Sequence, residues 1–244
     1  MVRLGIFLLI FSALYSLNAQ TIKILESNLD HIKMELSYSG YYSIKEKVYQ
    51  GKKFVYIDKN GVCYRKPGEP WIPSQYYNFG IPFNKIANYQ IISASQEKIP
   101  NISVLSYPDS ANQPIDRLKF DPAIYSKNKV FPVSPINITG QFIMRYVKGA
   151  SLEVAPYQYN PVTRELFFNK KILVQINFEP DSHNQVSSIY VKDKLTEDFV
   201  ASSFINSKEA KEFIGRSVNV KSPNHSTIDT SRYNSKIVPA NKLK

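Results

Sequence analysis

The sequence contains one cysteine, Cys63, and three histidines, His31, His183 and His225. A single cysteine excludes a disulfide framework within the chain and any zinc cluster built from several cysteines. Three histidines are little material for a histidine-built metal centre, so we expect neither a metal nor another cofactor. A nucleophilic Cys63 with His31 or His183 as its base has no supporting motif. Cys63 follows an Asn-Gly turn, where a small apolar strand residue is expected.

Glycine is also scarce, with nine among 244 residues. The chain has no glycine-rich phosphate-binding loop and no serine nucleophile elbow. The neighbouring carboxylates of Glu197 and Asp198 suit a helix N-terminus better than an acid–base pair, because they favour the positive end of the helix dipole. We therefore expect no catalytic residue in this chain.

A long apolar run occurs only at the N-terminus. Arg3 precedes 14 predominantly apolar residues (4–17), and the small residue Ala19 precedes Gln20. The run is short for a bilayer crossing and has the flanks of a secretory signal, although an uncleaved anchor is the alternative. We predict a signal peptide at residues 1–19 and a secreted mature chain from Gln20, without a membrane span.

Aromatic residues and proline are abundant, with 17 Tyr, 14 Phe and 15 Pro. Aromatic side chains pack well on pleated sheets, and proline suits the turns between strands. Alternating or apolar segments predict strands at 22–25, 31–38, 41–49, 53–57, 86–94, 141–147, 151–154, 166–168 and 171–178. The fold class predicted is mainly β, an antiparallel β-sandwich with one short C-terminal helix at 197–213. Thr196 is the predicted N-cap, and Asn206 could divide the helix in two.

The formal net charge is +11, or +10 once Arg3 is removed with the signal peptide. The lysines are dispersed along the chain, which favours a solvated surface over a nucleic-acid site, so we expect no nucleic-acid partner. Residues 215–244 differ in composition, being rich in Ser, Asn, Thr and Pro, with six basic residues and one acid. This stretch is predicted to be a flexible basic linker or tail.

Two proline-containing motifs stand out. Residues 68–73 read Gly-Glu-Pro-Trp-Ile-Pro, and residues 155–163 read Ala-Pro-Tyr-Gln-Tyr-Asn-Pro-Val-Thr. Proline fixes φ and removes a hydrogen-bond donor, so both motifs favour turns or edge strands. Asn-Pro in the second motif is typical of a turn between two strands.

These motifs resemble the propeptide of gingipain-type cysteine peptidases. The resemblance spans roughly residues 62–210 and includes residues 142–149, which lead into the second motif, the Phe131-Pro132 pair and residues 203–206. It predicts a propeptide-like β-sandwich domain at 20–214. The matching motif residues are Gly68, Pro70, Pro73, Ala155, Pro156, Tyr159, Asn160, Pro161 and Thr163.

The resemblance implies a secreted bacterial precursor, located in the periplasm, on the cell surface or outside the cell. In such precursors a prodomain assists folding of a caspase-like peptidase domain and covers its active-site cleft until proteolysis removes it. The implied partner is that cognate peptidase domain, in cis or in trans. The catalytic His and Cys of the family belong to the following domain, so this chain alone is not expected to hydrolyse peptides.

The resemblance also implies an inhibitory loop, which corresponds here to residues 103–119. Tyr107, followed by Pro108, occupies the most direct counterpart position, whereas the basic residues Arg117 and Lys119 come later. A basic side chain would pair with a carboxylate in the specificity pocket of the peptidase. Proteolysis concentrates in exposed polar tails, and the candidate processing positions there are Arg216, Lys221, Arg232 and Lys236.

Two other functions remain open from the sequence. A secreted β-sandwich can be a stand-alone surface binding or adhesion module that grips peptide or glycan through exposed tyrosines, here Tyr41, Tyr42, Tyr76 and Tyr77. The positive charge could instead attract an anionic polymer, and such binding would weaken steeply with salt.

Overall fold

The computed structural model describes residues 20–38, 43–49, 51–58, 65–110, 117–144, 147–182 and 194–213. The predicted signal peptide and the predicted tail, including its four processing candidates, lie outside the described residues. So do Cys63, the Asn60-Gly61 turn, Tyr41 and Tyr42. Within the described residues, no helix combines the length and apolar character that a membrane crossing requires.

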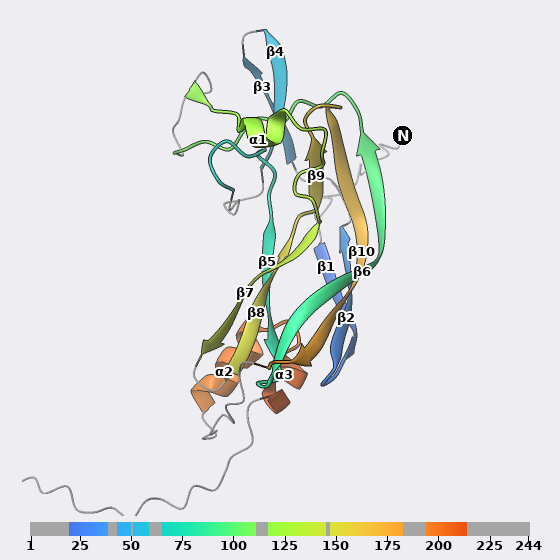
Figure 1. Cartoon of the computed structure of the whole chain (residues 1–244), viewed down its shortest axis with the longest axis vertical. Coiled ribbons are helices and arrows are strands. Elements are labelled where there is room, and N and C mark those ends of the chain that lie inside the picture. The colour runs from blue at the N-terminus through green and yellow to red at the C-terminus, as the bar shows by residue number, and fades with distance from the viewer. Residues whose placement is uncertain are drawn as a thin grey trace, which may run out of the picture.

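The larger sheet has five antiparallel strands (Figure 1). Its main order is β1 (Gln20–Ser27), β2 (His31–Tyr38), β10 (Glu165–Pro180) and β6 (Lys85–Ile99), and β9 (Tyr157–Asn160) also pairs with β10. Every second residue of β2 is buried, because successive strand side chains point to opposite faces of a sheet. One face of this sheet therefore forms part of the core.

A three-stranded antiparallel sheet contributes the other part of the core. Its order is β5 (Gln75–Ile81), β8 (Val147–Val154) and β7 (Ile136–Met144). Phe79 and Leu152 from this sheet belong to the same buried cluster as Ile172 and Val174 of β10. The prediction of a mainly antiparallel β fold is confirmed.

Several predicted strand boundaries are wrong. Segments 166–168 and 171–178 form one strand, β10, whose register with β6 shifts between Asn169 and Lys171. Segment 141–147 runs from the end of β7 into the start of β8. Strands β5 and β9 were not predicted, because they follow or overlap the proline motifs, whose local pattern favours turns.

The C-terminal part contains two helices rather than one, α2 (Lys194–Ser203) and α3 (Ser207–Phe213). The chain leaves the helical path between Ser203 and Ser207, and there the side chain of Asn206 pairs with both backbone groups of Gly80 in β5. The amide N of Gly80 donates to Asn206 Oδ1 at 2.8 Å, and Asn206 Nδ2 donates to the Gly80 carbonyl at 3.1 Å. Thr196 is buried within α2 and is not its N-cap.

Close packing requires glycine where α3 meets β5. A Cβ atom on Gly80 would lie 2.5 Å from the Cβ of Ala210, which is too short for any real contact. The missing side chain at Gly80 thus lets the helix approach the strand, and Asn206 fixes its position.

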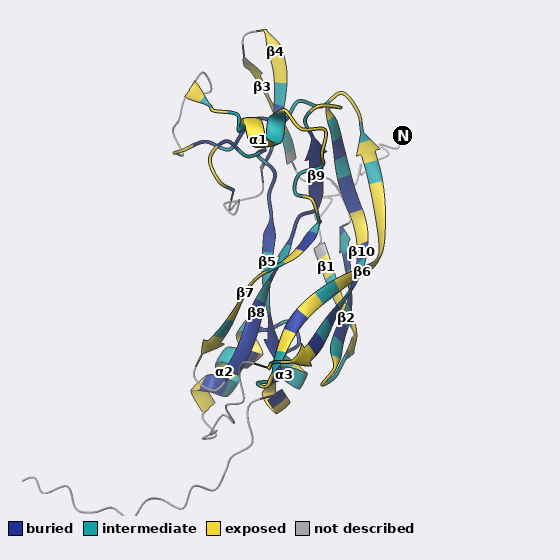
Figure 2. Cartoon of the chain, viewed as in Figure 1, coloured by how far each residue is buried: buried dark blue, intermediate teal, exposed yellow. Residues whose placement is uncertain are grey.

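The hairpin of β3 (Ser43–Tyr49) and β4 (Lys52–Asp58) projects from the opposite end of the molecule, near the short helix α1 (Pro122–Tyr125) (Figure 1). Much of its surface is exposed (Figure 2). The chain reverses at Gly51, whose φ of 71° suits glycine. Helix α1 is capped by Asp121, whose carboxylate accepts a hydrogen bond from the amide of Ala123 at 2.8 Å.

Candidate functional site

The first proline motif is hydrogen-bonded to one side of the start of the 103–119 segment. The amide of Gly68 donates to the carbonyl of Tyr107 at 3.0 Å, and the amide of Tyr107 donates to the carbonyl of Glu69 at 2.7 Å. The amide of Trp71 donates to Leu105 at 2.7 Å. Gly68 has a φ of 92°, a left-handed backbone conformation that favours glycine.

Strand β4 is hydrogen-bonded to the other side of this segment. The amide of Val55 donates to the carbonyl of Ser103, and the amide of Leu105 donates to the carbonyl of Val55, both at 2.8 Å. We name residues 103–108 the loop stem. Backbone hydrogen bonds hold it along both edges, which fixes the point from which the rest of the 103–119 loop departs.

The four candidate inhibitory residues have different environments. The Tyr107 ring packs edge-to-face on Trp71, with centroids 5.6 Å apart and an interplanar angle of 81°, and it is half-buried. Pro108 is buried. Arg117 and Lys119 are exposed, and residues 111–116 between the two pairs lie outside the described residues.

The second proline motif reaches the same loop stem. The side-chain oxygen of Asn160 accepts hydrogen bonds from the amides of Val162 and Thr163 at 3.1 and 3.3 Å, which makes the turn that the sequence predicts. The turn ends at Arg164, with a φ of 56°. The hydroxyl of Tyr159 donates to the carbonyl of Ile102, next to the stem, at 3.2 Å.

Most of the remaining matching residues are buried, and they contact neighbouring segments of the chain. Pro70 forms an isolated bridge with Ser106 of the loop stem. Pro73 is buried before β5. Ala155 donates to the carbonyl of Pro135, and Pro156 accepts from the amide of Asn169, each at 2.8 Å. Pro161 is half-buried within the turn after β9.

The hydroxyls of two tyrosines, Tyr125 and Tyr159, donate hydrogen bonds to backbone carbonyls of the stem and of the residue before it. The hydroxyl of Tyr125 donates to the carbonyl of Val104 at 3.1 Å, and its ring lies 6.5 Å from that of Tyr159. Burial raises the pKa of Tyr125 far above its usual value, and burial also raises the pKa of Tyr159. Both hydroxyls therefore stay protonated, and able to donate, to a higher pH than an exposed tyrosine.

Sequence reasoning missed Arg65, which joins the first motif to β8. Its side chain, 6% exposed, forms an ion pair with Glu153 at 3.1 Å. Its Nε donates to the carbonyl of Ile72 at 3.1 Å, and its Nη2 donates to the hydroxyl of Ser74. The Ser74 hydroxyl in turn donates to Glu153 at 2.6 Å. Nothing local marks this pair, because its members are 88 residues apart.

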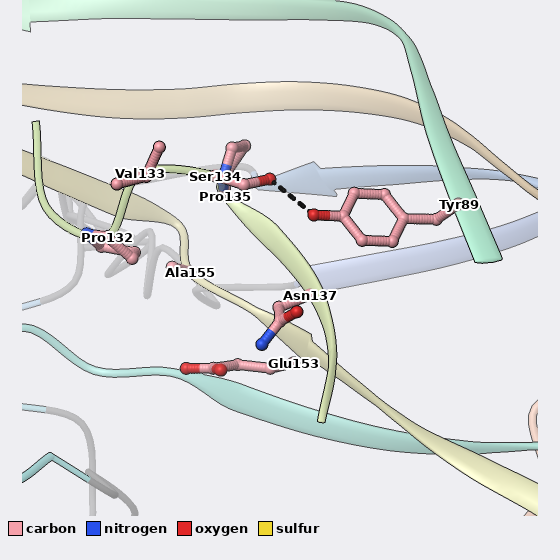
Figure 3. A pocket seen from close by; sticks show the side chains of 8 residues that line it. All are labelled: Tyr89, Pro132, Val133, Ser134, Pro135, Asn137, Glu153 and Ala155. Carbon is pink, nitrogen blue, oxygen red and sulfur yellow. Dashed lines mark hydrogen bonds between the residues drawn. The ribbon is translucent and has the colours of Figure 1, made fainter. Parts of the chain in front are cut away.

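A cavity of about 370 Å³ lies beside this network (Figure 3). Three of its polar residues bond within the protein: Glu153 binds Arg65, and the Tyr89 hydroxyl donates to Ser134 at 3.3 Å. Residues 132–135 and Ala155 complete the lining together with Asn137. The described residues contain no group of three or more His, Cys, Asp or Glu that could hold a metal ion.

The tyrosines proposed for a binding module are only partly accessible among the described residues. Tyr76 and Tyr77 are half-buried, and the Tyr77 hydroxyl donates to Gln75 at 2.8 Å. His31 lies on β2, where its Nε2 is 3.2 Å from a carboxylate oxygen of Glu26. The architecture so far is a β scaffold to which the loop stem is hydrogen-bonded along both edges, and the described residues form no constellation typical of catalysis.

Comparison with protein families assigns this architecture. The family model Propeptide_C25 matches residues 15–214. The chain belongs to this propeptide family. It is therefore the non-catalytic prodomain and not a peptidase domain, as the resemblance of its proline motifs predicts.

The propeptide is also similar to parts of known gingipains. It is 32% identical over 84 residues to gingipain R2 of Porphyromonas gingivalis, a match that covers 34% of this chain and 11% of the relative. It is 42% identical over 53 residues to gingipain R1 of the same organism, covering 22% of this chain and 5% of the relative. The matches thus cover a small fraction of these relatives' length.

Two solved structures share the fold of the propeptide. One is the complex of the pro- and mature domains of RgpB from P. gingivalis, with a TM-score of 0.63 and 17% identity, covering 77% of this chain and 97% of the other. The second, a structure concerning the zymogenic latency of gingipain K from the same organism, has a TM-score of 0.50 and 14% identity, with coverages of 66% and 93%.

Proposed function

We propose that this prodomain holds a secreted, gingipain-like cysteine peptidase inactive by laying the 103–119 loop across its cleft. It also assists folding of the peptidase and is removed by proteolysis. The partner is a caspase-like peptidase domain, and its complex would resemble in kind the solved complex of the RgpB pro- and mature domains. The signal-like residues 1–19 support the secreted location.

The observation that carries this proposal is the doubly anchored loop stem. Strand β4 binds one edge of the stem and residues 68–71 bind the other, through backbone bonds of 2.7–3.0 Å. A segment held in one conformation before binding loses less conformational entropy when it binds, so a loop with an anchored stem is suited to occupy a cleft.

Among the four candidate residues, the structure favours Arg117 and Lys119 as the ones that contact the peptidase, because both are exposed. Tyr107 and Pro108 instead anchor the stem. A guanidinium or ammonium group fits a specificity pocket that contains a carboxylate. Cleavage after Arg216, Lys221, Arg232 or Lys236 would then separate the prodomain from the peptidase domain.

The test is an inhibition assay with the chain from Gln20 and the separately prepared cognate peptidase. We expect inhibition that saturates, and weaker inhibition for Arg117→Ala or Lys119→Ala, whichever enters the pocket. Lys23→Ala, an exposed change on β1, is the control and should inhibit like the parent chain. Full peptidase activity at a large molar excess of the folded chain would refute the proposal.

A further inference from the structure

The charged residues of the described chain are unevenly distributed. We define the loop end as the segments around the loop stem: residues 43–58 apart from Gln50, 66–71, 103–110, 117–130 and 161–164. These segments contain ten basic and five acidic residues. The rest of the described chain contains eleven basic and twelve acidic residues. The positive excess of the described residues thus lies at the loop end.

The lysines away from the loop end are largely neutralised by neighbours. Ion pairs there join Lys85 to Asp30, Lys98 to Glu165, Lys148 to Asp181, Lys170 to Glu97, and Lys171 to Glu35. These pairs lie between adjacent strands or at strand ends, so they belong to the scaffold.

Lysines at the loop end are arranged differently. Five of them are exposed and form no ion pair with the described part of the chain: Lys52, Lys66, Lys119, Lys127 and Lys129. Acids nearby already have partners of their own, as three of them illustrate. Glu46 pairs with Lys53, Glu69 accepts the amide of Lys66 at 2.9 Å, and Asp121 caps α1. The positive charge here is therefore left for an external partner.

These lysines are held on the same framework as the loop. The amide of Asp121 donates to Gly68 at 3.0 Å, which connects the Lys119 segment to the Lys66 segment. The turn after α1, which carries Lys127 and Lys129, is joined to β9 by a 2.8 Å bond from Asn160 to Asn128. A partner that binds the 103–119 loop must therefore come close to these lysines.

We propose that the loop end is an electrostatic docking surface and that the peptidase surface around its cleft is acidic. This inference rests on the proposed function and adds the charge of the partner. A nucleic acid is the weaker fit, because single-strand sites offer free aromatic rings for base stacking. Here the rings of Phe54 and Phe120 pack on one another, with centroids 6.1 Å apart, and Phe120 packs on Tyr125.

Complementary charge accelerates association more than it strengthens the final complex. The informative quantity is accordingly the association rate constant between the chain from Gln20 and the mature cognate peptidase. We expect it to fall about tenfold or more between roughly 50 and 500 mM NaCl, because salt screens exposed charges. The same loss is expected at low salt for the double variant Lys127→Glu/Lys129→Glu, which leaves the inhibitory candidates intact.

The matched control is Lys208→Glu/Lys211→Glu on α3, which changes the net charge equally at the other end of the molecule (Figure 1). Its association rate should stay within about twofold of the parent. Circular dichroism checks that both variants fold. Equal effects in the two variants would show that only net charge matters and would overturn the proposal. Tighter binding to heparin or duplex DNA than to the peptidase would also overturn it.

The docking-surface proposal and the proposed function can be refuted independently of each other. If the chain inhibits the peptidase, but neither salt nor Lys127→Glu/Lys129→Glu slows association, the acidic-rim proposal is wrong and the inhibitory function stands. If the folded parent chain neither binds nor inhibits the peptidase at any salt concentration, both are wrong.

Discussion

Replacing Arg65 by methionine should destabilise the prodomain strongly. The guanidinium is 6% exposed and contacts Glu153, which is 15% exposed, as well as the buried Ser74. Methionine removes the positive charge but keeps much of the apolar volume. It therefore leaves the Glu153 carboxylate partly buried without its counter-charge, a situation that costs about 3–5 kcal/mol in proteins.

The double variant Arg65→Met/Glu153→Met separates the ion pair from the packing around it. Removing both charges of a buried pair is often close to neutral, so the remaining cost should come from the Ser74 hydroxyl, which loses both partners. An unsatisfied buried group of this kind costs about 1–3 kcal/mol. The double variant should thus be more stable than either single variant.

Urea denaturation followed by circular dichroism measures this effect. With a urea dependence of about 3 kcal/mol per M, a loss of 3–5 kcal/mol lowers the midpoint by about 1–1.7 M. If Arg65→Met costs less than about 1 kcal/mol, or if the double variant costs the sum of the singles, the network is not coupled as described. Arg65 also holds the Ile72 carbonyl beside the loop stem, so the single variant should inhibit the peptidase less well at temperatures where it remains folded.

Three further predictions concern the contact of α3 with β5 and the hydroxyl of Tyr159. Gly80→Ala should destabilise the chain by about 1–3 kcal/mol in thermal unfolding, and Ala210→Gly in the same chain should restore part of the loss, because the new Cβ would lie 2.5 Å from that of Ala210. Asn206→Ala should cost about 1–3 kcal/mol in urea, since it leaves both backbone groups of Gly80 without partners; an unchanged midpoint would contradict this. Tyr159→Phe should make the stability of the folded chain less sensitive to alkali. Because the folded-state pKa of Tyr159 is raised above 10, its contribution to stability is complete below pH 10 and declines as the pH rises further. Melting curves of the parent and the variant between about pH 8 and 11 would test this.

The sequence predicts best those features that depend on neighbouring residues. The alternation in β2 identifies a half-buried strand, because the side-chain period of two is visible in a short segment. The turn at Asn160 is predicted with its cause, since asparagine bonds to amides two and three residues ahead. Asn206 is likewise a local signal, and it marks the division between α2 and α3.

Features that depend on distant partners could not be predicted in this way. The pairing of Arg65 with Glu153 depends on the position of the first motif beside β8, and the docking of Asn206 on Gly80 joins residues 126 apart. Which of the four inhibitory candidates are anchored in the stem and which are exposed also depends on tertiary contacts. Tyr107 has the more direct counterpart position in sequence, yet Trp71 packs against its ring and holds it in the stem.

A prodomain that acts as proposed has to inhibit in the precursor and yet leave after cleavage, and its affinity must satisfy both requirements. A covalent linker raises the effective concentration of the prodomain to about the millimolar range, so even a micromolar complex stays closed in the precursor. After cleavage, the same complex dissociates on dilution. A loop stem anchored on both edges and a solvated basic surface suit this balance. In the proposed complex, the stem would limit the entropy cost of binding, whereas the exposed lysines would speed the encounter without adding the buried contacts that slow release.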